Sequence, residues 1–149
     1  MDKKSALFVC IHNSARSQMA EAFLKKHGGD LFARVESAGI EAGTLNPLVV
    51  KVMAEKGIDI SGNRTKKAMS FVTSNTHFDY VITVCDEANA ERCPVFPGIH
   101  IRLKWFFTDP SSLLGSEDEK LKKIRLIRDE IEETISNWAE SIRMKSQEA

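Results

Sequence analysis

The chain has 149 residues, and its 21 lysines and arginines balance its 21 aspartates and glutamates. This length fits one domain, residues 1–149, that can bury a hydrophobic core without needing disulfides or a structural metal. The balanced charge gives no support for nucleic-acid or membrane binding, and no apolar run is long enough for a secretory signal or a transmembrane helix. We therefore expect a cytoplasmic protein, and a monomer because no spare apolar stripe is evident.

The first half of the chain alternates between expected strands and helices. Residues 5–10 form a short apolar run typical of a buried strand. A polar turn follows, and a helical pattern then begins at Ser17 and stops at Gly28-Gly29. A second strand is expected at residues 33–38, and Asn46-Pro47 begins another helix.

The second half continues in the same way. We expect a short helix around residues 66–72, and residues 79–84 form a run continuous enough for a strand buried on both faces. Residues 99–103 give a fourth strand, and residues 105–114 follow as a loop. Strand followed by helix, repeated, predicts an α/β three-layer sandwich: a four-stranded parallel sheet with helices on both faces.

The last helix begins near Glu117 and carries one apolar stripe on a charged surface. Its members step by three or four residues: Leu121, Ile124, Ile127, Ile131, Ile135, Trp138 and Ile142. Such a stripe predicts that the helix docks against the sheet. In a parallel sheet the active site lies beyond the carboxyl ends of the strands, so the residues that follow each strand are the candidates for chemistry.

The turn after the first strand has the form Cys-x5-Arg-Ser, from Cys10 to Ser17. Backbone N–H groups of a tight turn can point inward together, and the following helix adds its positive end. The Arg16 guanidinium can bind two oxygens of a tetrahedral anion. The same field favours the nucleophilic thiolate form of Cys10, to which Ser17 can donate its hydroxyl. The backbone groups expected to bind the anion belong to Ile11, His12, Asn13, Ser14, Ala15 and Arg16.

Asp109-Pro110 is expected in the loop after the fourth strand. Breaking a bond to the leaving oxygen of an oxyanion needs a proton, and a positioned carboxylic acid can supply it. Asp-Pro is also a common turn signal. The residues alone favour this plainer interpretation.

Two further cysteines, Cys85 and Cys93, stand with seven residues between them. That intervening sequence has reasonable helix propensity, and eight residues of helix rise by about 12 Å. A disulfide needs Cα atoms within about 7 Å. If this segment is helical when reduced, pairing these cysteines requires it to bend or unwind, which would be a redox switch if both thiols are used. The alternative is that Cys93, beside Pro94, is a packing residue.

The stretch from Val9 to Glu21 resembles the oxyanion loop of the low-molecular-weight protein tyrosine phosphatase superfamily, and especially its thioredoxin-coupled arsenate reductase branch. The match continues through Glu36-Ser-Ala-Gly39, Asn46-Pro47, Gly57-Ile-Asp-Ile-Ser61, Val81–Cys85, Cys93-Pro94, Trp105 and Asp109-Pro110. It covers nearly the whole chain. The resemblance therefore implies a fold and an activity as well as a loop.

The implied reaction is the reduction of arsenate to arsenite, with no cofactor. Cys10 attacks arsenate, and Asp109 acts as the general acid. Cys85 then attacks the Cys10 sulfur, and arsenite leaves with two electrons. Cys93 next attacks Cys85, and thioredoxin reduces the resulting disulfide. Phosphate or sulfate would compete with arsenate.

This chain departs from the family in two places. The thioredoxin-linked members usually have six residues between the paired cysteines, which puts the geometry of the switch in question. Some members also bind potassium through residues that match Asn13, Glu21 and Ser37, but their remaining carboxylate falls near Lys67, where a lysine could replace the cation. We therefore expect no metal, and we expect Asn13, Glu21 and Ser37 to brace the loop by hydrogen bonds.

Two other functions compete with this interpretation. A low-molecular-weight tyrosine phosphatase uses the same loop and acid but hydrolyses the thiophosphate with water. Such phosphatases usually carry aromatic residues after their Asp-Pro, whereas Ser111-Ser112 follow here, although Phe106 and Phe107 could wall a site. The paired cysteines favour the reductase, with weak phosphatase activity beside it. A non-enzymatic oxyanion sensor is disfavoured by the intact nucleophile, arginine and acid.

Overall fold

A computed structural model describes residues 2–148 of the chain. Its four strands form one parallel sheet in the order β2-β1-β3-β4. Their bounds are β1 (Lys4–Cys10), β2 (Phe32–Gly39), β3 (Tyr80–Thr83) and β4 (Ile101–Lys104). Each strand lies where an apolar run predicts one.

The start of β4 corrects the sequence prediction by two residues, from Ile99 to Ile101. Gly98 has a φ of 80°, so the chain is still turning there, and the side chain of Ile99 is 96% exposed. The pairing with β3 begins only where the Ile101 N–H donates to the Asp79 carbonyl, at 2.9 Å. The apolar residue Ile99 therefore belongs to the turn.

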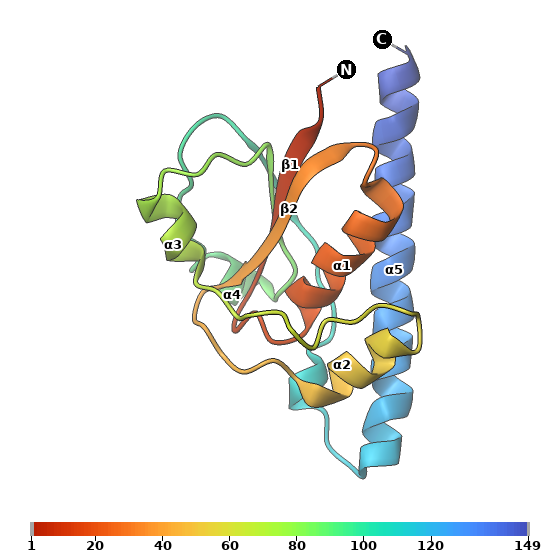
Figure 1. Cartoon of the computed structure of the whole chain (residues 1–149). Helices are drawn as coiled ribbons and strands as arrows, with labels where there is room; N and C mark the ends of the chain where they lie inside the picture. Colours follow the sequence, from red (N-terminus) through yellow and green to blue (C-terminus); the bar gives the residue numbers. More distant parts are fainter. Residues whose placement is uncertain (1, 149) are drawn as a thin grey trace.

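The helices lie on both faces of the sheet, which confirms the expected three-layer α/β architecture. Figure 1 shows α1, α2 and α5 on one side of the strands and α3 and α4 on the other. The bounds are α1 (Arg16–Gly28), α2 (Pro47–Ala54), α3 (Ala68–Thr73), α4 (Glu87–Ala90) and α5 (Glu117–Glu148), with a short 3₁₀ turn, η1 (Pro110–Ser112), before α5. No helix within residues 2–148 is long and apolar enough to cross a bilayer.

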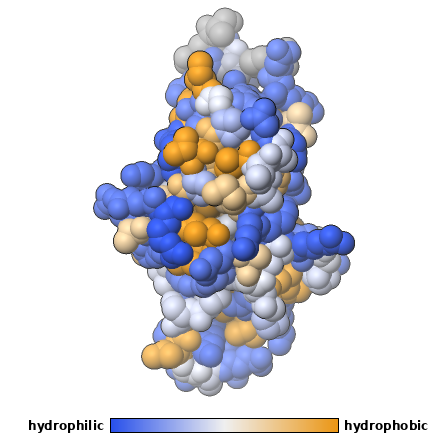
Figure 2. Space-filling view, turned by 90° about the vertical axis from the view of Figure 1, so that its left-hand side faces the viewer, coloured by the Kyte–Doolittle hydropathy of each residue, from blue (hydrophilic) through white to orange (hydrophobic). Residues whose placement is uncertain are grey.

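Side chains of β1 alternate between two apolar clusters, as the pleat of a strand requires. Phe8 and Cys10 belong to the larger core, which packs against α1 and α5. Leu7 and Val9 belong to a smaller core on the other face, which also contains Cys93. On that side, seen in Figure 2, hydrophobic residues are interspersed among hydrophilic ones. The two cores place cysteines on both faces of the same sheet.

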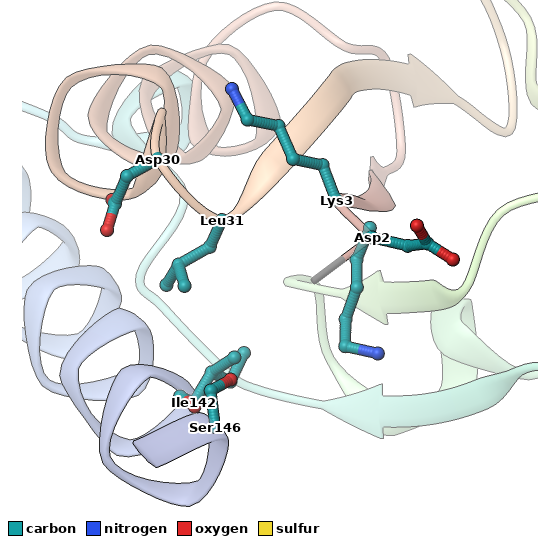
Figure 3. A pocket seen from close by; sticks show the side chains of 7 residues that line it. Asp2, Lys3, Asp30, Leu31, Ile142 and Ser146 are labelled. Atoms are coloured by element: carbon teal, nitrogen blue, oxygen red, sulfur yellow. Dashed lines mark hydrogen bonds between the residues drawn. The ribbon is translucent and has the colours of Figure 1, made fainter.

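The apolar stripe of α5 faces the larger core, as predicted. Trp138 on this helix packs against the rings of Phe32, Tyr80 and Trp105, with centroid distances between 5.1 and 5.5 Å. At the amino end of the sheet, a small hollow separates β1 from the last turns of α5 (Figure 3). This hollow lies at the opposite end of β1 from Cys10.

Truncating the stripe should destabilise the fold strongly. Ile131 is fully buried in the larger core, so we expect Ile131→Ala to lower the free energy of unfolding by about 2–5 kcal/mol, through lost burial and a residual cavity. Urea denaturation would measure it. Leu126→Ala on the same helix is the control, because Leu126 is 69% exposed. Equal losses in the two variants would contradict the assignment of the buried face.

Candidate active site

The carboxyl ends of three strands bring the predicted chemistry to one edge of the sheet. Cys10 is the last residue of β1. Cys85 comes two residues after β3, and Asp109 comes five residues after β4. This arrangement follows from the parallel strand order.

The oxyanion loop, residues 10–16, is held from outside by the chain that follows β2. Backbone N–H groups of that chain donate to loop carbonyls at 2.8–3.0 Å: Ile40 to Cys10, Glu41 to Ile11, Gly43 to His12 and Asn46 to Ser14. A Cβ on Gly39 would collide with backbone atoms of Glu41 and His12, so only glycine permits this approach. With its carbonyls bound outward, the loop can turn N–H groups toward Cys10, and the Asn13 N–H donates to the Cys10 sulfur at 3.2 Å.

Asn13 organises the loop from within. It is fully buried, and its φ of 56° is a left-handed conformation that asparagine tolerates better than most residues. Its Oδ1 accepts hydrogen bonds from Gln18 Nε2 at 3.1 Å and from the Lys66 N–H at 3.0 Å. Its Nδ2 donates to Ser17 Oγ at 2.7 Å.

Ser17 Oγ lies 2.8 Å from the sulfur of Cys10. Because this oxygen already accepts a hydrogen bond from Asn13, its own hydrogen can point to the sulfur. A donor aimed at sulfur stabilises a thiolate more than a thiol. The contacts thus fit Cys10 as a nucleophile.

Arg16 connects the oxyanion loop to the loop that carries Asp109. Its guanidinium is buried, donates to the Phe107 carbonyl at 3.1 Å, and lies 3.8 Å from Asp109 Oδ2. Asp109 Oδ1 accepts from the Ser111 N–H at 3.0 Å. The Asp109 side chain keeps 32% exposure. The carboxyl group can therefore reach both the anion and solvent.

Cys85 lies beside this cluster, and Cys93 does not. Both are buried free thiols. Burial raises the pKa of Cys85 to about 11. The nearby positive charge of Arg16 lowers this pKa, and the nearby Cys10 thiolate raises it. Cys93 packs in the smaller core instead. There burial raises its pKa, and Arg102 opposes the rise.

The segment between these cysteines is helical for one turn, Glu87–Ala90, and not along its whole length. The Asp86 side chain caps this turn by accepting from the Asn89 N–H at 2.8 Å. A proline after Cys93 disfavours further helix. Cys85 and Cys93 thus lie at the two ends of a short, capped turn.

Of the three residues expected to brace the loop, Glu21 and Ser37 bond each other, and Lys66 joins them to Asn13; Lys67 does not. Ser37 Oγ donates to Glu21 Oε1 at 2.7 Å, and Lys66 Nζ is 3.9 Å from the same oxygen. The backbone of Lys67 is extended and bridges to Gly39. Side chains of consecutive extended residues point in opposite directions. Within residues 2–147, no group of three or more His, Cys, Asp or Glu side chains could hold a metal.

One feature of the site has no signal in the sequence. The His12 side chain points outward and is 51% exposed. Its Nε2 lies 3.4 Å from Glu41 Oε2, and Glu41 Oε1 lies 3.7 Å from Arg92 Nη2. These residues are too far apart in the chain for any local pattern to predict the contact.

Comparison with known proteins agrees with this geometry. Residues 5–148 match the family described as low molecular weight phosphotyrosine protein phosphatase, and the chain belongs to this family. It is 46% identical to an arsenate reductase of Bacillus licheniformis, over 95% of this chain and 99% of that protein.

Solved structures extend the similarity. An arsenate reductase in its oxidised state is 31% identical, with a TM-score of 0.76 over 93% of this chain and 98% of that one. A thioredoxin-dependent arsenate reductase of Corynebacterium glutamicum is 30% identical, with a TM-score of 0.61 over 89% of this chain and 62% of that one.

The raised pKa of Cys85 predicts low reactivity in the reduced protein. An unperturbed thiol titrates near pH 9.0, so the folded thiol, with a pKa of about 11, should carry roughly 100-fold less thiolate at pH 7.5. We expect correspondingly slow alkylation of Cys85 by iodoacetamide, rising as the pH approaches 11. Peptide mass mapping would measure it, with the protein in urea as the control. Equal rates in folded and unfolded protein would contradict the assignment.

Proposed function

We propose that this protein reduces arsenate to arsenite with Cys10 as the nucleophile and Cys85 and Cys93 as a disulfide relay that thioredoxin reduces. One observation carries the proposal: a second buried thiol, Cys85, lies beside the Cys10–Arg16 pair. A phosphatase needs only one cysteine. Weak phosphatase activity should coexist, because the loop binds any tetrahedral oxyanion.

The first step uses the oxyanion loop as it stands. Arg16 and the inward N–H groups bind the oxygens of arsenate, and phosphate or sulfate compete for them. The Cys10 thiolate forms a bond to arsenic, and the departing oxygen takes a proton from Asp109. Asp109 suits this role because it lies beside Arg16 and is part-exposed.

The second step reduces arsenic. The Cys85 thiolate attacks the Cys10 sulfur, the sulfur–arsenic bond breaks, and its electron pair leaves with arsenic as arsenite. The products are As(III) and a Cys10–Cys85 disulfide, so the electrons balance. Burial opposes ionisation of Cys85, and the Arg16 guanidinium favours it. Arg16 thus acts on both thiols of the pair.

The third step restores Cys10. The Cys93 thiolate attacks Cys85, Cys10 leaves as a thiolate, and an external dithiol reduces the Cys85–Cys93 disulfide. Cys93 must leave the smaller core for this attack. The thioredoxin dependence of the Corynebacterium relative supports thioredoxin as the dithiol.

Around this chemistry, Asn13 braces the loop directly through Ser17. Glu21 and Ser37, bonded to each other, would brace it through Lys66, whose N–H donates to Asn13 Oδ1 and whose ammonium supplies positive charge beside Glu21. Lys25 adds a second ammonium, at 2.8 Å from Glu21 Oε2. The reaction needs no cofactor. The protein would act as a cytoplasmic monomer, where thioredoxin is available.

Removing Cys93 tests the relay. With thioredoxin, thioredoxin reductase and arsenate, the wild type should oxidise NADPH continuously. Cys93→Ser should complete at most about one turnover, because the Cys10–Cys85 disulfide is not resolved, while its hydrolysis of p-nitrophenyl phosphate persists. Full turnover in Cys93→Ser would make Cys93 a packing residue. A wild type that hydrolyses the ester well but ignores arsenate would be a phosphatase.

Removing the acid tests the role of Asp109. We expect Asp109→Asn to lower kcat for p-nitrophenyl phosphate by roughly 10²- to 10⁴-fold, because the amide cannot donate a proton to the leaving group. Steady-state kinetics would measure the loss. Asp118→Asn, at an exposed position of α5, is the matched control and should behave as wild type. An unchanged kcat in Asp109→Asn would assign this Asp-Pro to a turn alone.

A further inference from the structure

The relay segment, residues 86–93, carries Cys93 and makes few polar contacts with the rest of the protein. Its backbone hydrogen bonds and its Asp86, Asn89 and Arg92 side-chain contacts are internal to the segment. Across residues 2–147, the one ion pair or hydrogen bond that joins it to another part of the chain is the Arg92–Glu41 pair, at 3.7 Å. Besides packing and the attraction between Asp86 and the charge of Arg16, this pair is what holds the segment in place.

Glu41 is itself fixed to the oxyanion loop. Its N–H donates to the Ile11 carbonyl at 2.8 Å, and its carboxylate lies 3.4 Å from His12 Nε2. Both contacts are with residues inside the turn that surrounds Cys10. The Glu41 carboxylate therefore lies between the anion-binding turn and the segment that must later move.

We infer that Glu41 is a positioning residue that latches the relay segment to the oxyanion loop through Arg92 and so keeps Cys93 in the smaller core. The inference rests on the proposed disulfide relay. Arg92 directly precedes Cys93, so Cys93 cannot travel to Cys85 without displacing the Arg92 backbone.

The exposure of the pair suits a link that opens in every cycle. The side chains of Arg92 and Glu41 are 51% and 57% exposed, and exposed ion pairs are weak and screened by salt. A second contact stiffens the segment itself, because Arg92 Nη1 donates to Asn89 Oδ1 at 3.1 Å. Releasing Glu41 would thus free the segment as a unit.

The test follows one turnover of the reduced full-length protein. Arsenate is mixed with the protein without thioredoxin, samples are quenched in acid and alkylated, and mass mapping follows conversion of the Cys10–Cys85 disulfide into the Cys85–Cys93 disulfide. Glu41→Gln should speed this conversion about two- to five-fold, the range expected for an exposed pair. Hydrolysis of p-nitrophenyl phosphate should stay unchanged in Arg92→Gln, because Arg92 lies outside the oxyanion loop and its supporting chain and that reaction does not need Cys93.

Three comparisons separate a latch from a general structural effect. Glu91→Gln, an exposed carboxylate of the same segment, should leave the conversion rate unchanged. Arg92→Gln should speed conversion, and adding Glu41→Gln to it should give no further gain. The difference between wild type and Glu41→Gln should shrink as salt rises.

Two outcomes would overturn the inference. If the wild type forms the Cys85–Cys93 disulfide and Glu41→Gln forms it at an equal or slower rate, the latch is contradicted and the relay is not. A wild type that never forms this disulfide removes the relay, and the latch with it.

Discussion

The hydrogen bonds between the oxyanion loop and the chain after β2 decide what the rest of this site can do. A tight turn has as many carbonyls as N–H groups, and an anion site needs only the N–H groups. Backbone N–H groups of residues 40–46 bind the loop carbonyls from outside, so these carbonyls do not face the anion. Asn13 and Ser17 then complete the inner side, where they contact each other and the Cys10 sulfur. The nucleophile is thus supported by a second, outer layer of backbone.

The parallel sheet gives the three cysteines three different environments. Cys10 ends β1 and belongs to the larger core, and Cys93 packs in the smaller core on the opposite face. Cys85 follows β3, the strand between β1 and the edge strand β4. In the proposed relay, electrons passed from Cys93 to Cys10 would therefore cross from one layer of the sandwich to the other. Cys85, at the carboxyl edge of the sheet, would be the intermediate position.

The parts of this structure that depend on local patterns could be predicted from the sequence. The strands and long helices follow apolar periodicity. The Cys10–Ser17 loop is predicted because its cysteine, arginine and serine, placed between a strand and a helix, together suit the binding of an oxyanion. That Lys66 rather than Lys67 lies near Glu21 could not be predicted, because it depends on which way one extended residue points. The single turn of α4 depends on its cap and on tertiary packing. The Glu41–Arg92 pair joins residues 51 positions apart, and no spacing rule reaches that far.

The burial of Cys93 has a consequence for how the protein endures oxidative stress. Peroxides attack thiolates that are accessible and convert them stepwise to sulfenic, sulfinic and sulfonic acids, the last of which are irreversible. A protonated thiol buried in the smaller core, which also contains Phe96, Val81 and Leu7, offers peroxide neither charge nor access. In the proposed relay, the electron pair for the last internal exchange would thereby be protected until the chain around Cys93 opens for turnover.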